Sequence, residues 1–262
     1  MTSFTTTVVS DGPTLAAMLN SVAALPKFPP SLFLDLEGIN LCRHGTISII
    51  SLFVAPFDAV YIVDITTLGA KAFTTATTAA HVGSATLQTI LEDPTVPKVF
   101  FDVRNDSDAL FSLYGVRLAG VEDVQLMEIA GRVPIRRQYL AGLAKLMLKS
   151  NIVSRSEAND WLLVKDAGLK LFAPEKGGSF VVFDARPLRP EIEAYCANDV
   201  RYLPRLHARY WNGLNGAWKY KVVAEAARRV AESQGPGYNP RGPDKAKGPP
   251  GWCYQGSSAG QQ

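Results

Sequence analysis

Short apolar runs separated by turn residues dominate the first half of the chain and predict β-strands. Three of these runs, at residues 31–37, 46–54 and 59–65, are rich in leucine, isoleucine, valine and phenylalanine. Residues 4–10 also suit a short strand, and Pro13 opens a helical pattern that a proline-rich segment ends. The close spacing of the three longer runs predicts an antiparallel meander rather than parallel strands joined by helices.

The rest of the chain is predicted to be mostly helical, with two further short strands. Strands are expected at residues 98–101 and 121–124, and helices at residues 85–91, 105–114, 125–131, 191–211 and 217–233. Leu110 and Leu113 are expected to face inward from their helix. From Gln234 onward, glycine, proline, serine and glutamine replace the hydrophobic period. We therefore expect an α/β domain over residues 1–233 and a disordered tail over residues 234–262.

The composition of the 262 residues excludes several classes of protein. A hydrophobic fraction of 47% and a charged fraction of 19% are those of a globular chain with room for a full core. No apolar run reaches the length of about 18 residues that a membrane span needs, so no membrane association is expected. The N-terminus lacks the regions of a signal peptide, and Cys42, Cys196 and Cys253 show no metal-site spacing. These features indicate a reducing, intracellular compartment, either cytoplasmic or nuclear.

Two segments place acidic groups beside one another or beside a phenol. Asp35 and Glu37 close the first long strand, and the period of two places both carboxylates on one face of the sheet. Two adjacent acids are electrostatically costly unless a cation lies between them. Tyr195 and Asp199, four residues apart on a predicted helix, share a helix face. A phenol one turn from a carboxylate can orient a water molecule that a metal ion activates.

A third segment, residues 98–110, runs from a buried strand into a helix that begins with Asp102, Asp106 and Asp108. Aspartate is common at such positions because it caps the helix and meets the positive end of the helix dipole. Capping therefore accounts for at least one of the three. Taken singly, each of the three segments also fits an ordinary strand end or amphipathic helix, so only their combination is informative.

Together, the three segments resemble the exonuclease motifs of the RNase D family in type and order. The pattern is Asp-x-Glu on the first long strand, a Lys-Val segment that leads to Asp-x-x-x-Leu, and a late Tyr-x-x-x-Asp helix. The residues around the first two motifs look like the eukaryotic branch related to Egalitarian and the EXD-type proteins, and residues 171–188 are similar to its fungal members. The resemblance spans residues 32–206. It implies an RNase H-like α/β fold with a mixed sheet of five to six strands flanked by helices.

The resemblance also implies a set of catalytic residues: Asp35, Glu37, Asp106, Tyr195 and Asp199. Asp106 takes the second motif because it stands eight residues after Lys98, whereas Asp102 and Asp108 miss that register. A tyrosine rather than a histidine in the third motif defines the DEDDy subclass. Many relatives in the EXD-like branch lack one or more of the four acids, and this sequence keeps all of them.

The implied cofactors are two divalent metal ions, Mg²⁺ or Mn²⁺. Hard cations of this kind prefer carboxylate oxygens, and the three scattered histidines offer no zinc site. Two such ions about 3.5–4 Å apart stabilise both the attacking and the leaving oxygen of an in-line displacement. In the family pattern Asp35 bridges the ions, Glu37 and Asp199 complete the ion that carries the water, and Asp106 helps to hold the other. Tyr195 orients the water.

The expected substrate-binding residues are Gly38, Ile39 and Asn40, since glycine permits close approach of the terminal nucleotide. Other basic residues, namely Arg132, Arg136, Arg137, Lys165, Lys170 and Arg186, are candidate phosphate contacts that solvated surfaces explain equally well. The net charge of +3 is a weak indication in the same direction.

The sequence thus favours a metal-dependent 3′–5′ exonuclease that acts on RNA or single-stranded DNA and releases nucleoside 5′-monophosphates. The alternative is a non-catalytic RNA-binding adaptor on the same fold, which would bind nucleic acid without turnover. Retention of the four acids and of Tyr195 favours the enzyme. No second nucleic-acid-binding domain is recognisable, which leaves a homodimer or a protein partner to supply processivity.

Overall fold

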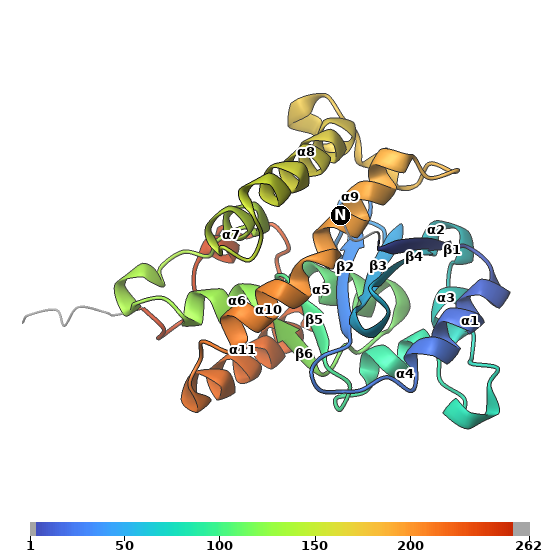
Figure 1. The fold of residues 1–262 in the computed structure, drawn as a ribbon, viewed down its shortest axis with the longest axis horizontal. Coiled ribbons are helices and arrows are strands. Elements are labelled where there is room, and N and C mark those ends of the chain that lie inside the picture. The colour runs from blue at the N-terminus through green and yellow to red at the C-terminus, as the bar shows by residue number, and fades with distance from the viewer. Residues whose placement is uncertain (1–3, 254–262) are drawn as a thin grey trace, which may run out of the picture.

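A six-stranded mixed sheet lies at the centre of the molecule, in the order β1-β4-β3-β2-β5-β6 (Figure 1). The computed structural model describes residues 4–253. The strands are β1 (Thr5–Val9), β2 (Leu32–Glu37), β3 (Ile49–Val54), β4 (Ala59–Asp64), β5 (Lys98–Phe100) and β6 (Val121–Asp123). The predicted meander is confirmed, because β3 is antiparallel to both β2 and β4. The other pairs, β1 with β4, β2 with β5 and β5 with β6, are parallel.

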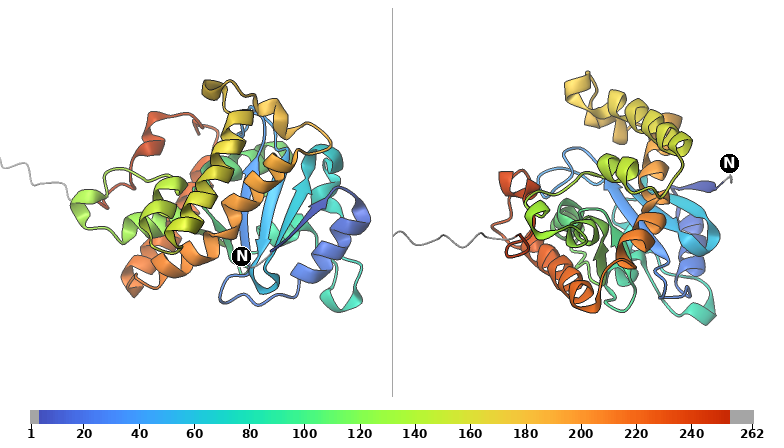
Figure 2. Two further views of the ribbon diagram at one scale, coloured as in Figure 1. Left: turned by 45° about the horizontal axis from the view of Figure 1, so that its top comes forward. Right: turned by 60° about the vertical axis from the view of Figure 1, so that its left-hand side comes forward.

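Helices flank the sheet on both faces, as Figures 1 and 2 show. They are α1 (Gly12–Val22), α2 (Ile65–Leu68), α3 (Lys71–Thr74), α4 (Leu87–Glu92), α5 (Arg104–Tyr114), α6 (Val124–Ala130), α7 (Leu143–Lys149), α8 (Arg155–Phe172), α9 (Pro190–Arg201), α10 (Leu203–Trp211) and α11 (Gly216–Gln234). α9 packs on β2, β3 and β4, α8 runs alongside α9 (Figure 2), and α11 packs on α5, α6 and β6. Across residues 4–253, no helix combines the length and apolar character needed to span a bilayer.

The core centres on β2 and β3, whose apolar runs are covered on both faces. Leu34 and Leu36 of β2 are 1% and 3% exposed, and every residue of β3 is buried. Such continuous burial is typical of central strands between two helical layers. Asp35 and Glu37 are the partly exposed residues of β2, so the sheet itself positions these two acids.

Two helix predictions need correction. Residues 191–211 form two helices rather than one, because the chain turns at Tyr202 between α9 and α10. Pro204 lacks an N–H and therefore suits only the first turn of a helix, where α10 places it. Leu113 does not face inward: it is 37% exposed, whereas Leu110 is fully buried.

Residues 235–253 fold back over the molecule, so the predicted disorder does not hold for this segment. It pairs with the loop before α7, where Gly248 N donates to the carbonyl of Gln138 at 2.9 Å. The Tyr238 hydroxyl donates to Asn105 Oδ1 at 2.8 Å, and Trp252 is only 8% exposed. Individual side chains anchor this segment without a hydrophobic period. The rest of the predicted tail, residues 254–262, lies outside the described residues.

Candidate active site

The end of β2 presents two of the predicted acids to the helix that lies across it. Asp35 and Glu37 flank the buried Leu36 and point to the same side of the sheet. α9 crosses this side and brings Asp199 to the pair. One carboxylate oxygen each from Asp35, Glu37 and Asp199 lie within 4.8 Å of one another. We call these three residues the acid cluster.

Asp199 and Tyr195 come from the buried face of α9, and both are 5% exposed. Asp199 Oδ2 accepts a hydrogen bond from Lys165, whereas Oδ1 is buried without a hydrogen-bond partner in the described part of the chain. A buried carboxylate oxygen without a partner is costly, and here it lies among other carboxylate oxygens. This donor set fits a hard divalent cation such as Mg²⁺ or Mn²⁺.

Asp106 lies in the first turn of α5, is 6% exposed and stands outside the group of three. Its two acidic neighbours on α5 and the preceding turn are already paired. Asp102 accepts two hydrogen bonds from Arg104 at 2.6 Å, and Asp108 accepts one from Arg43 Nε at 2.7 Å. Among residues 4–253, Asp106 is the member of this trio without an ion pair. Asp106 thus stays the candidate for the acid of the second motif, although Asp102 rather than Asp106 lines the cavity at the acid cluster.

Burial raises the pKa of Asp35, Glu37, Asp106 and Asp199, and repulsion between acids adds to this effect at the first three. Desolvation, followed by the charge of Asp199, raises the pKa of Asp35 to about 7. Desolvation and the charge of Asp35 also raise the pKa of Glu37 and of Asp106 well above their ordinary values. Desolvation raises the pKa of Asp199 as well, although Lys165 opposes it. A cation bound among these acids would relieve both causes.

α8 contributes Lys165, which the sequence indicated only as one of several candidate phosphate contacts. Its Nζ donates to the Tyr195 hydroxyl at 2.8 Å and pairs with Asp199. Four other candidates have partners elsewhere: Arg186 pairs with Asp64, Lys170 with Asp166 and Arg132 with Glu128, and Arg137 donates to the carbonyl of Ala130 at 2.9 Å. The signal that could have singled out Lys165 is the glycine one turn later on the same helix, Gly168, which marks a close approach of two elements.

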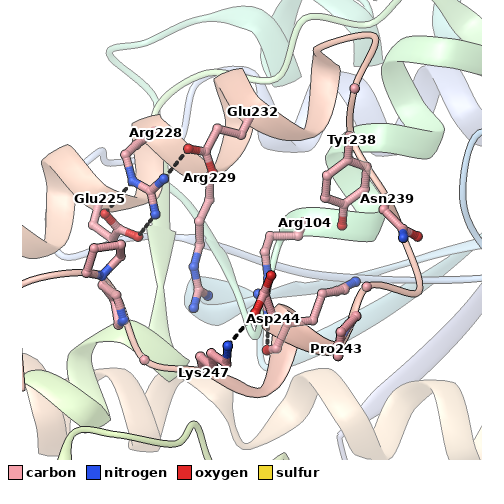
Figure 3. Close-up of a pocket in the computed structure, with 16 residues that line it drawn as sticks. Arg104, Glu225, Arg228, Arg229, Glu232, Tyr238, Asn239, Pro243, Asp244 and Lys247 are labelled. Atoms are coloured by element: carbon pink, nitrogen blue, oxygen red, sulfur yellow. Dashed lines mark hydrogen bonds and ion pairs between the residues drawn. The ribbon is translucent and has the colours of Figure 1, made fainter.

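The site is a cavity of about 350 Å³. Its lining consists of Asp35, Glu37, Phe101, Asp102, Gln125, Gly142, Leu143, Lys165, Tyr195, Asp199 and Leu203. A larger hollow of about 710 Å³ lies between α11 and residues 237–250 (Figure 3). All three acids that line it have basic partners: Arg228 pairs with Glu225 and Glu232, and Lys247 with Asp244. In the smaller cavity, Asp35 and Glu37 have no ion pair among the described residues.

Gly38, Ile39 and Asn40 follow β2 but do not line the acid cavity. A Cβ at Gly38 would lie 2.1 Å from the carbonyl oxygen of Thr46, so the loop's own backbone requires glycine here. Asn40 has a positive φ of 50°, and its Oδ1 accepts a hydrogen bond from Arg241 at 3.0 Å. Asn40 instead lines a separate hollow of about 390 Å³, together with Tyr238 and Arg241 of the C-terminal segment.

Comparison with known proteins gives three results. Residues 7–215 match the family model described as 3′-5′ exonuclease. The human piRNA biogenesis protein EXD1 is 32% identical over 167 residues, which cover 64% of this chain and 29% of that protein. This chain thus spans less than a third of the length of that relative.

The third result concerns the fold. The structure of Trypanosoma brucei RNase D in complex with GMP has a TM-score of 0.72 at 22% identity, covering 95% of this chain and 70% of that one. The complex of the same protein with RNA U12 has a TM-score of 0.72 at 21% identity, covering 95% and 78%. The RNase D-like fold expected from the sequence is confirmed.

Proposed function

Because this chain belongs to the 3′-5′ exonuclease family, we propose that it is a metal-dependent nuclease that removes nucleotides from the 3′ end of RNA or single-stranded DNA. The products would be nucleoside 5′-monophosphates. One observation carries the proposal: Asp35, Glu37 and Asp199, with raised pKa values and one unpartnered buried oxygen, converge beside the buried Tyr195.

Each group of the site has a separate role in this proposal. Asp35, Glu37 and Asp199 form one side of the metal site, and Asp106 approaches Asp35 from α5. Bound divalent ions would supply positive charge to the attacking and leaving oxygens of the phosphodiester. Tyr195 stays protonated, since burial and the neighbouring acids raise its pKa well above the ordinary value. Its hydroxyl is therefore able to orient a water molecule by hydrogen bonding.

RNA is the first substrate to test, because the Trypanosoma brucei relative was solved with RNA U12 and with GMP, itself a nucleoside 5′-monophosphate. The assay uses 5′-labelled single-stranded RNA and DNA with Mn²⁺, Mg²⁺ or EDTA. We expect a ladder that shortens from the 3′ end, requires a divalent ion and disappears in Asp35→Ala. The expected loss in kcat/KM is at least about 10³-fold, since metal ions contribute several kcal/mol to the transition state.

Asp160→Ala is the matched control, because Asp160 is an exposed aspartate on α8. It should leave the rate unchanged. Intact substrate in every lane, with fully folded protein, would refute the nuclease proposal.

A second candidate, the non-catalytic RNA-binding adaptor, is favoured by one feature. Lys165 pairs with Asp199, so the chain itself supplies a counter-charge to one of the three clustered acids. The adaptor predicts RNA binding without turnover, and binding that survives Asp35→Ala. A gel-shift assay beside the nuclease assay separates the two candidates.

A further inference from the structure

Contacts between α8 and α9 fix the position of Lys165 over the acid cluster. Trp161, one turn earlier on α8, donates through Nε1 to the carbonyl of Asn198 at 3.0 Å, and Asn198 Nδ2 donates to the carbonyl of Trp161 at 3.1 Å. Gly168 lies on the other side of Lys165, where a Cβ would stand 2.4 Å from Cδ2 of Tyr195. These contacts hold the two helices so close that the side chain of Lys165 reaches the cavity.

The ammonium group of Lys165 is an enclosed cation. It donates to the Tyr195 hydroxyl at 2.8 Å, pairs with Asp199 Oδ2 and lies 4.2 Å from the centre of the Tyr195 ring. The side chain is 18% exposed. A carboxylate, a phenol oxygen and a ring face are the surroundings that stabilise an ammonium cation.

A divalent cation and this ammonium group would compete for the same carboxylate. Asp199 has one oxygen without a partner and one that Lys165 occupies. Two positive charges within a few ångströms of each other repel strongly in a partly desolvated site. We propose that Lys165 is an internal counter-ion of the metal-free site, which gives up its ion pair with Asp199 when a divalent cation binds and keeps its hydrogen bond to Tyr195.

The retained hydrogen bond makes Lys165 a positioning residue for Tyr195. An ammonium group is a donor without acceptor capacity, so it must occupy a lone pair of the phenol oxygen. The hydroxyl proton of Tyr195 is then directed away from Lys165, toward the acids and any water bound there. This role rests on the proposed function, since it assigns Asp199 and Tyr195 to the metal-dependent reaction.

The first test measures metal binding without substrate. Mn²⁺ affinity of the full chain is determined by electron paramagnetic resonance of the free ion, for wild type, Lys165→Met and Lys170→Met. Lys165→Met keeps the apolar stem and removes the competing charge, so we expect Mn²⁺ to bind about tenfold more tightly or better. Lys170→Met is the control, because Lys170 is 67% exposed and pairs with Asp166 on the surface of α8; its affinity should match wild type.

Unchanged or weaker Mn²⁺ binding by Lys165→Met would overturn the proposal. If Lys165 were purely structural, its substitution would lower stability equally with and without metal. If Lys165 is a counter-ion, its substitution lowers stability more when no metal is bound. We therefore expect the melting temperature of Lys165→Met to fall in EDTA and to approach that of wild type at saturating Mn²⁺. An equal fall under both conditions counts against the counter-ion.

A second measurement uses the wild-type protein, so it does not depend on the variant folding. Reductive methylation of lysines, followed by mass spectrometry, reports how freely each amine reacts. Lys165 should react faster with Mg²⁺ than with EDTA, while Lys170 reacts at the same rate in both. If Lys165 is methylated at the same rate with Mg²⁺ and with EDTA, the metal ion does not displace Lys165 from Asp199. Neither measurement requires turnover. A chain that passes both tests but shows no nuclease activity would therefore refute the nuclease proposal and leave the counter-ion role of Lys165 in place.

Discussion

At the scale of single residues, the acid cluster sets how stability depends on pH. The pKa of Asp35 is about 7 in the folded chain, above its ordinary value of 3.8. Between these two values the folded state holds more protons than the unfolded state, so the free energy of unfolding falls as pH rises. We expect the melting temperature in EDTA to be higher at pH 5 than at pH 7.5. Saturating Mn²⁺ should reduce or reverse this difference, because the cation stabilises the ionised acids.

Asp35→Asn is the control for this dependence. The amide keeps the shape of the side chain and cannot ionise, so the decrease between pH 5 and pH 7.5 in EDTA should be smaller than in wild type. An unchanged slope would show that other groups govern the pH dependence.

A neighbouring pair of arginines on α11 gives a second prediction, at the scale of elements. Arg229 is 4% exposed and donates to Asp123 at 2.7 Å, an aspartate that is fully buried between β6 and α6. Arg229→Ala would leave this carboxylate without its cation, at a cost of about 3 kcal/mol in the free energy of unfolding. Arg228 is 43% exposed and pairs with glutamates on its own helix, so Arg228→Ala should cost less than about 1 kcal/mol.

Urea denaturation of the two variants checks this prediction. Equal losses would mean that the buried pair does not tie α11 to the sheet. The comparison is well matched, since the two substitutions are adjacent and chemically identical.

The contact between α8 and α9 yields a third prediction. In an isolated helix, Gly168→Ala would be favourable by about 1 kcal/mol. Here the new methyl group would lie 2.4 Å from the ring of Tyr195, so the ring or the helix must move. We expect nuclease activity to fall by more than about tenfold, as Tyr195 loses its position. Gly216→Ala, at the start of α11 where a Cβ meets open space, should retain full activity in the same 3′-end assay.

Local patterns in the sequence predicted more of the site than contacts between distant segments did. Strand and helix periods placed Asp35 beside Glu37 and Tyr195 beside Asp199 on common faces, and the resemblance to the RNase D family joined the two pairs into one candidate site. The role of Lys165 was not predictable, because it depends on how α8 crosses α9, a packing of residues about 30 positions apart. Local preference also failed for Leu113, since periodicity gives the direction of a side chain but not what covers it.

For the whole molecule, the segment over residues 235–253 connects parts that are far apart in sequence. Trp252 packs edge-on against Trp218 of α11, with ring centres 5.1 Å apart, and is 8% exposed. Periodicity did not predict its burial, because the residues before it, Gly248, Pro249, Pro250 and Gly251, carry no hydrophobic period.

Trp252→Ala should therefore destabilise the fold, by about 3 kcal/mol if the packing is that of an ordinary core aromatic. Tyr220→Ala, at a residue of α11 that is 78% exposed, should have little effect. Thermal or urea unfolding measures both. A Trp252 variant as stable as wild type would mean that the C-terminal segment only rests on the surface.

Contacts made by residues late in the sequence have a consequence for synthesis of the chain on the ribosome. A ribosome makes the chain from its N-terminus, so every residue of the acid cluster is translated before Arg229 and before the backbone carbonyls of Ser233 and Gly235 that bind Arg43. A polypeptide that ends between residues 199 and 229 would carry the full set of acids, yet Asp123 would lack its buried counter-charge. The fold, and with it a competent site, would then be complete only in chains extended past residue 235. Translation fragments would be substrates for cellular quality control rather than stray nucleases.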